Sequence, residues 1–122
     1  MQEVRHHRRL EGPVIVDYRF LDDAGMRGNA PAANISEGGV CFHVARLVPL
    51  HTAVELQLHI GRVGANAVTV RGQVIWMRQG SEPSPTPYEI GIAFDQPSTQ
   101  PVQYFLRRLY VYWRQLMRPP RE

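Results

Sequence analysis

Two short segments carry side chains whose types and spacing suit the binding of an anion that also carries a base. The first is Arg5-His6-His7-Arg8-Arg9, close to the N-terminus. In an extended segment Arg5 and Arg9 point to the same side, because their spacing is even. Arginine binds the O6 and N7 atoms of guanine in bidentate fashion, and it binds phosphate as well. The pair therefore suits a ligand with both groups, although a solvated basic tail with non-specific affinity for nucleic acid has the same composition.

The second segment is Asn34-Ile35-Ser36-Glu37-Gly38-Gly39. Asn34 and Ser36 are two residues apart at the end of a predicted strand, so they share a face. The Asn amide both donates and accepts hydrogen bonds, and the Ser hydroxyl does either. A neighbouring glycine lets a ligand approach the backbone closely. The same residue types also make ordinary tight turns between strands, so this segment alone leaves both interpretations open.

Short alternating apolar runs predict the elements that position these two segments. Alternation of apolar and polar residues is typical of half-buried strands. Gly72 interrupts one run, which suggests a bulge or a barrel corner. The predicted strands cover residues 14–20, a weaker stretch at 27–34, 40–44, 54–60, 68–76 and 90–94.

The spacing of apolar residues changes to three and four after Pro97, which predicts a helix over residues 98–118. Ser98 or Thr99 is suited to cap it, and Pro119-Pro120 is expected to end it. The apolar stripe comprises Val102, Phe105, Leu106, Leu109, Tyr110, Trp113, Leu116 and Met117. Several strands followed by one helix predict a mainly β fold, an antiparallel sheet or barrel with the helix packed against it.

Composition and length limit the classes of protein to which this chain can belong. A chain of 122 residues with 43% apolar and 20% charged residues predicts one globular domain. Apolar runs are too short for a bilayer span, and none resembles a signal peptide, so a cytoplasmic protein is expected. A lone cysteine, Cys41, forms no intrachain disulfide. The net charge of +3, with arginine supplying all 14 basic residues, favours anionic partners.

Taken together, the two segments resemble the signature of the PilZ domain, a bacterial receptor family. That signature is RxxxR before the first strand and [D/N]xSxxG between strands two and three, here Arg5-x-x-x-Arg9 and Asn34-x-Ser36-x-x-Gly39. The segments Gly72-Gln73-Val74-Ile75-Trp76 and Tyr88–Phe94 also look like strands of the family. The resemblance covers about residues 3–97.

The resemblance implies a six-stranded antiparallel β-barrel with a C-terminal α-helix, which binds cyclic di-GMP on its outer surface. By analogy, Arg5 and Arg9 hold guanine and phosphate, while Asn34, Ser36 and Gly39 contact the other side of a guanine. Arg8 is expected to add charge or to stack on a base, and Trp76 offers an aromatic face for a second ligand molecule unless it lies in the core.

The implied organisation is a flexible arginine segment at 1–12, a barrel at 13–97 and a helix of the same domain at 98–118. The implied function is that of a receptor and adaptor, which passes the second-messenger signal to a separate protein in motility, polysaccharide export or adhesion. His6 and His7 lie between the two arginines. Their protonation would strengthen phosphate binding, so we predict that affinity rises as the pH falls from about 8 to 6.

Other functions are weighed against this one. The five histidines show no metal-binding spacing, and no nucleophile with a base or phosphate-binding loop occurs, so neither a metal, a cofactor nor enzyme activity is expected. Two alternatives remain: a PilZ-like scaffold that acts by protein contact without nucleotide, and a barrel that binds single-stranded nucleic acid. Tyr104, Val111 and Tyr112 make the helix more apolar than one buried stripe requires, which suggests a partner protein or self-association.

Overall fold

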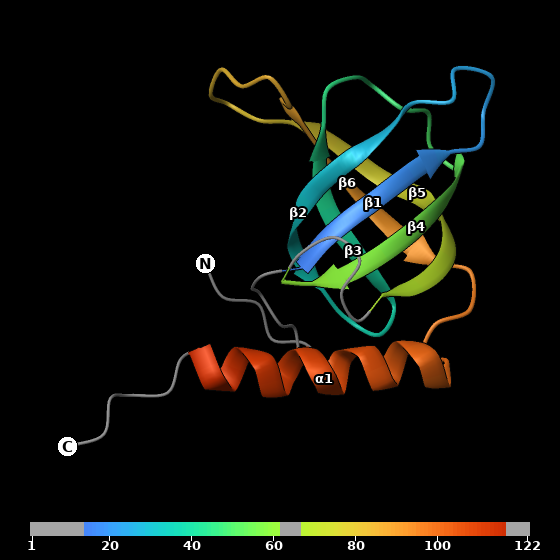
Figure 1. The fold of residues 1–122 in the computed structure, drawn as a ribbon. Coiled ribbons are helices and arrows are strands. Elements are labelled where there is room, and N and C mark those ends of the chain that lie inside the picture. The colour runs from blue at the N-terminus through green and yellow to red at the C-terminus, as the bar shows by residue number, and fades with distance from the viewer. Residues whose placement is uncertain (1–13, 62–66, 117–122) are drawn as a thin grey trace.

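The computed structural model describes residues 14–61 and 67–116, and these form a closed barrel with one helix (Figure 1). All neighbouring strands are antiparallel and follow the order β1-β2-β3-β6-β5-β4 around the barrel. The elements are β1 (Val14–Phe20), β2 (Arg27–Ile35), β3 (Gly39–Val44), β4 (Ala53–Ile60), β5 (Val68–Gln79), β6 (Tyr88–Phe94) and α1 (Gln100–Leu116). The mainly β fold, the six-stranded barrel and the C-terminal helix predicted above are confirmed.

The barrel interior is filled by the apolar members of each alternating run. Val16 on β1 pairs with Leu58 on β4, and both side chains are fully buried. Arg19, on the same strand as Val16, points outward and is exposed. A shift by one residue would bring such charges into the core, so the alternation fixes the register of the strands. Closure also leaves no exposed strand edge among the described strands.

The long strand β5 differs from the prediction at Gly72. The strand runs through Gly72 without interruption, and its bulge lies between Val74 and Trp76 instead. A Cβ at Gly72 would lie 2.3 Å from the carbonyl oxygen of Ala93 on β6. Gly72 therefore permits close contact of two strands, and the register shifts only after Val74.

Helix α1 lies across one end of the barrel, where it buries Val102, Phe105 and Leu109 (Figure 1). Of the two predicted caps Thr99 is the one used, because Ser98 adopts a left-handed φ of 61°, and the helix begins at Gln100. The Thr99 hydroxyl accepts a hydrogen bond from the Val102 amide at 3.4 Å. The proposed stop at Pro119-Pro120 lies outside the described residues. No helix among the described residues is long and apolar enough to cross a membrane.

Candidate functional site

Asn34 lies at the end of β2, on the outside of the barrel. Ile35 beside it is 1% exposed and points into the core, so Asn34 faces the other way. A bulge between Ala32 and Asn34 precedes it, and its cross-strand partner is Cys41 on β3. The Asn34 side-chain amide makes no hydrogen bond with any residue that the structure describes. No other described residue therefore takes up its donor and acceptor groups.

The loop from Ser36 to Gly39 is a tight turn, as one of the two interpretations predicted. The Ser36 amide donates to the Gly39 carbonyl at 2.9 Å, and the Gly38 amide donates to the Ser36 hydroxyl oxygen at 3.3 Å. The Gly38 carbonyl accepts a bond from the Phe94 amide of β6 at 2.9 Å. The loop is thus fixed to the barrel, while the Ser36 hydroxyl proton can still donate.

Gly39 is required by the packing of β3 on β6. A Cβ at this position would lie 2.1 Å from the carbonyl oxygen of Ile92, an atom of the neighbouring backbone. Any side chain at this position would push the two strands apart. The sequence argument assigned Gly39 to ligand contact, and the strand packing is a second reason for a glycine here.

Four outward-facing residues on four neighbouring strands form one row of cross-strand pairs that begins at Asn34. The registers pair Asn34 with Cys41, Cys41 with Gly91, and Gly91 with Trp76, on β2, β3, β6 and β5 respectively. Adjacent strands lie roughly 4.8 Å apart, so this row is wide enough to support a planar base. We call these four residues, with Ser36 and Gly39, the motif face.

The Trp76 indole packs against Gly91 on this face. A Cβ at Gly91 would come within 2.3 Å of the indole ring, so only glycine leaves room for it. Arg78 places its guanidinium 5.7 Å from the ring centroid, and it also forms an ion pair of 2.7 Å with Glu89. Trp76 is partly exposed on the outer surface, so the interpretation that it lies in the core is wrong, and its contact with a ligand stays a prediction.

The turn of the motif is also bonded to the start of the helix. The Ser98 amide donates to the Glu37 carbonyl at 3.1 Å, and the Ser98 hydroxyl donates to the Glu37 carboxylate. Ser98 directly precedes the cap Thr99, so these bonds connect the Asn34–Gly39 turn to the start of α1. No sequence pattern pointed to this contact, because the two residues are far apart in the chain.

The arginine segment cannot be placed in the same way. Arg5, Arg8 and Arg9, together with His6 and His7, lie outside the described residues. Strand β1 begins at Val14 and runs antiparallel to β2. The start of β1 therefore lies at the same end of the barrel as the end of β2.

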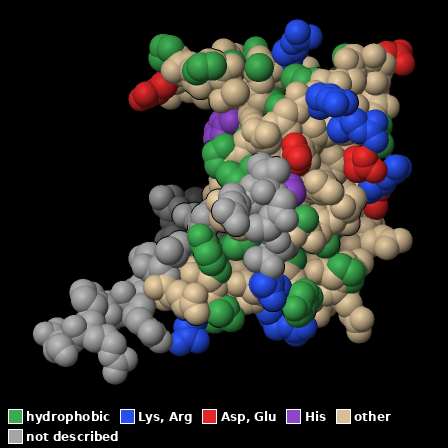
Figure 2. All heavy atoms as spheres, in the orientation of Figure 1, with side chains coloured by type: hydrophobic (Ala, Val, Ile, Leu, Met, Phe, Trp, Pro, Cys, Tyr) green, Lys and Arg blue, Asp and Glu red, His purple; other side chains and the backbone are tan. Residues whose placement is uncertain are grey.

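The opposite outer face, over β1, β4 and β5, carries paired charges instead. Arg19 and Arg71 flank Glu55 directly across the strands, with nitrogen–oxygen distances of 2.7 and 3.4 Å. The hydrogen bond from Arg19, aided by the charge of Arg71, lowers the pKa of Glu55 below its usual value. We call these three residues the charged face, and Figure 2 shows arginine and acidic side chains gathered on this side.

A hollow of about 550 Å³ lies beside the charged face, bordered by residues such as Asp17, Tyr18 and Gln57. Of the predicted site residues that the structure describes, Asn34, Ser36 and Gly39, none borders it. Arg19 and Glu55 line it too and form an ion pair, and Arg27 lies at its border together with Asp17. Within the described residues, no group of three potential metal ligands comes together.

The fold resembles several solved structures. The structure of the Bacillus subtilis inhibitor of motility (MotI/DgrA) superposes with a TM-score of 0.68 at 15% identity. That alignment covers 98% of this chain and 55% of the other, so the present chain spans about half the length of that protein. The PilZ domain of YcgR from Escherichia coli with c-di-GMP has a TM-score of 0.69 at 12% identity, over 93% of this chain and 95% of that one.

A third structure, the MrkH–c-di-GMP complex of K. pneumonia, has a TM-score of 0.68 at 14% identity and covers 94% of this chain and 56% of that one. The comparison with curated proteins gave no match. The family model of the PilZ domain matches residues 3–110, which includes both motifs, the whole barrel and more than half of α1. On that match, this chain belongs to the PilZ domain family.

Proposed function

We propose that this chain is a receptor for cyclic di-GMP that binds its ligand on the motif face and acts as an adaptor, not as an enzyme. The observation that carries the proposal is the outward Asn34 amide, which has no hydrogen-bond partner among the described residues and lies in one row with Gly91 and Trp76. Family membership adds to it, because PilZ domains are receptor and adaptor domains. The PilZ structure of YcgR and the MrkH complex both contain c-di-GMP.

The proposed contacts divide between the two motifs. The guanidinium groups of Arg5 and Arg9 bind guanine edges and phosphates, and Arg8 adds positive charge. Asn34 and the Ser36 hydroxyl form hydrogen bonds with the edge of a guanine on the barrel surface, and Gly39 lets that base approach the backbone. Trp76 offers its indole to a base at the far end of the row.

The signal would leave the site through the helix. Ligand contact with Asn34 and Ser36 stabilises one arrangement of their turn, and Glu37 in that turn bonds Ser98 at the start of α1. The surface displayed by the barrel end and α1 then changes, and a separate protein reads it. Such coupling requires that cyclic di-GMP bind the two arrangements with different affinity.

The direct test is a calorimetric titration with cyclic di-GMP, with GTP and cyclic di-AMP as controls. We expect saturable binding of cyclic di-GMP alone, with a stoichiometry that distinguishes a single molecule from a stacked pair. Arg9→Ala should weaken binding by about 1–3 kcal/mol, the value of a bidentate arginine–guanine contact. Arg19→Ala is the matched control, because it removes an arginine from the charged face.

Other results would support the alternatives. Absence of heat and of thermal stabilisation would make the protein a nucleotide-independent scaffold. Binding of single strands without preference for guanine, and with steep salt dependence, would indicate a nucleic-acid-binding barrel. Equal affinity of the Arg9→Ala variant and the unaltered protein would mean that the ligand binds elsewhere.

A further inference from the structure

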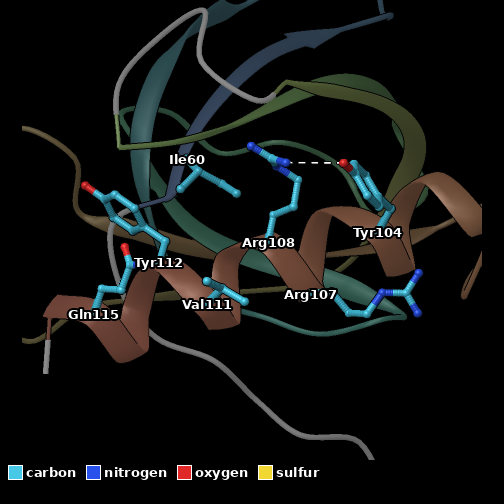
Figure 3. A pocket seen from close by; sticks show the side chains of 7 residues that line it. All are labelled: Ile60, Tyr104, Arg107, Arg108, Val111, Tyr112 and Gln115. Carbon is cyan, nitrogen blue, oxygen red and sulfur yellow. Dashed lines mark hydrogen bonds between the residues drawn. The ribbon is translucent and has the colours of Figure 1, made fainter. Parts of the chain in front are cut away.

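A second surface feature lies away from the motif face, between α1 and the end of β4. It is a hollow of about 340 Å³ lined by Ile60, Tyr104, Arg107, Arg108, Val111 and Tyr112, which we call the α1 groove (Figure 3). Its volume falls in the range of about 300–1,000 Å³ that is typical of binding pockets. None of the motif residues Asn34, Ser36 or Gly39 borders it.

The walls of the α1 groove are held in place by local contacts. Tyr112 places its hydroxyl against Gly61, where a Cβ would lie 3.1 Å away, and Gly61 has the left-handed φ of 84° that suits a glycine. At the other end the Arg108 guanidinium donates a hydrogen bond of 3.2 Å to the Tyr104 hydroxyl and lies over the Tyr104 ring. Figure 3 shows Ile60 between these two ends, facing the helix. The groove is thus formed before any partner binds.

Its chemistry combines apolar surface with positive charge. Tyr104 is 56% exposed and Val111 is 53% exposed, although both lie on a helix whose other side is buried. Arg107 is exposed and has no carboxylate partner among the described residues. The whole of α1 contains no Asp or Glu, and Figure 2 shows arginine and apolar side chains side by side along it.

We infer that the α1 groove is a docking site for an acidic segment of a partner protein that carries at least one large apolar side chain. Tyrosine and arginine are enriched where proteins bind each other, and apolar anchors in pockets supply most of the energy. In such a complex the anchor contacts Ile60 and Val111, and neighbouring carboxylates face Arg107 and Arg108. This inference is independent of the ligand that the motif face binds.

Two other occupants fit the groove less well. In a symmetric dimer the same patch faces itself, which would bring the arginines of α1 against those of its copy. Single-stranded nucleic acid stacks successive bases on a series of aromatic side chains, whereas among the described residues that line the groove only Tyr104 and Tyr112 are aromatic. An acidic protein segment meets neither obstacle.

The test uses the full chain without cyclic di-GMP, so a failure of the proposed receptor function does not affect it. Fluorescence anisotropy follows the binding of labelled synthetic peptides in which leucine and phenylalanine alternate with aspartate and glutamate. The comparison peptides carry lysine at every acidic position. We expect saturable binding of the acidic peptides and none of the lysine peptides.

Two variants, each with a control variant, locate the binding. The charge reversal Arg107→Glu/Arg108→Glu should weaken acidic-peptide binding at least about tenfold, and Arg114→Glu, on the same helix outside the groove, should change it less than about threefold. Val111→Asp should also weaken it, whereas Leu47→Asp, at an exposed apolar residue of the β3–β4 loop, should not. Circular dichroism verifies that every variant is folded.

Three results would overturn the inference. The first is equal peptide binding by the charge-reversed variant, or no binding of any acidic peptide. The second is a dimer in sedimentation experiments that the α1 variants dissociate, which would assign the groove to a second copy. The third is an oligonucleotide that binds in place of the acidic peptide and is lost in the same variants.

Discussion

The motif face and the charged face share one barrel and one alternation of inward and outward residues, yet their outward side chains differ in kind. On the charged face, Glu55 is held between Arg19 and Arg71 directly across the strands. On the motif face, a small residue or an aromatic ring occupies each position, and Asn34 has no hydrogen-bond partner among the described residues.

This difference separates two things: which outward residues become neighbours, which the fold determines, and whether they bond to one another, which their types determine. The pairing of strands determines which residues lie side by side, but the residue types decide whether they satisfy one another. Exposed ion pairs across strands contribute little to stability and leave neither charge for a ligand. The row from Asn34 to Trp76 contains no ion pair of its own, although Arg78 and Glu89 form one beside Trp76. The donor and acceptor of the Asn34 amide are therefore not taken up by another described residue.

The largest effect that separates the two faces is expected for Gly91→Val. The new side chain would collide with the Trp76 indole, which lies within 2.3 Å of an added Cβ. Overpacking of this kind destabilises by about 1–3 kcal/mol. Urea unfolding measures it, and Thr69→Val, on the outside of β5, is a matched control that should change stability by less than about 0.5 kcal/mol. Equal stability of the two variants would mean that Trp76 does not lie on Gly91 in solution.

A smaller effect is expected when one amide is removed from each face. Asn34→Ala should weaken cyclic di-GMP binding by about 0.5–1.5 kcal/mol, the net value of a typical hydrogen bond. Gln57→Ala on the outside of β4 should leave the affinity unchanged, because Gln57 lies next to the charged face. Calorimetry of both variants measures the difference. If Gln57→Ala weakened binding and Asn34→Ala did not, the site would have to be moved to the opposite side of the barrel.

The smallest effect concerns Glu55 and pH. Its pKa is lowered in the folded protein, chiefly by the hydrogen bond from Arg19, so the unfolded chain holds this proton more tightly. Glu55 therefore contributes stability above its usual pKa of 4.5, and this contribution is lost as the pH falls through the lower, folded-state pKa. Glu55→Gln should slightly reduce the fall in melting temperature between neutral and acidic pH, most visibly at low salt. Identical curves of melting temperature against pH for the variant and the unaltered protein would show that these ion pairs contribute nothing to stability.

The sequence predicted those features that depend on local periodicity. Alternation along β1 and β4 and the three-to-four spacing in α1 sufficed for the barrel and the helix. Spacing predicted only that Asn34 and Ser36 share a face; the outward position of Asn34 follows from the burial of Ile35 in the structure. Features that depend on register were not predictable: Trp76 over Gly91 is visible only once β5 is paired with β6.

Gly72 illustrates the limit of such reasoning. A glycine in a strand marks either a bulge or a close approach, and the sequence does not distinguish the two. The bulge lies after Val74, while Gly72 admits the backbone of β6. The bond between Glu37 and Ser98 was likewise beyond prediction, because it depends on how α1 docks. The roles of Arg5, Arg8 and Arg9 stay predictions, since these residues lie outside the described part of the chain.

The measurement that tests the central claim most directly is a nuclear magnetic resonance titration of the isotope-labelled protein with cyclic di-GMP. If the ligand binds the motif face, the amide signals of Asn34 and Gly39 and the indole N–H signal of Trp76 will shift together as ligand is added. The amide signals of Arg19, Glu55 and Arg71 will remain in place. Shifts concentrated on those three residues, or saturation of the protein with no change at Asn34 and Trp76, would contradict the assignment of the site.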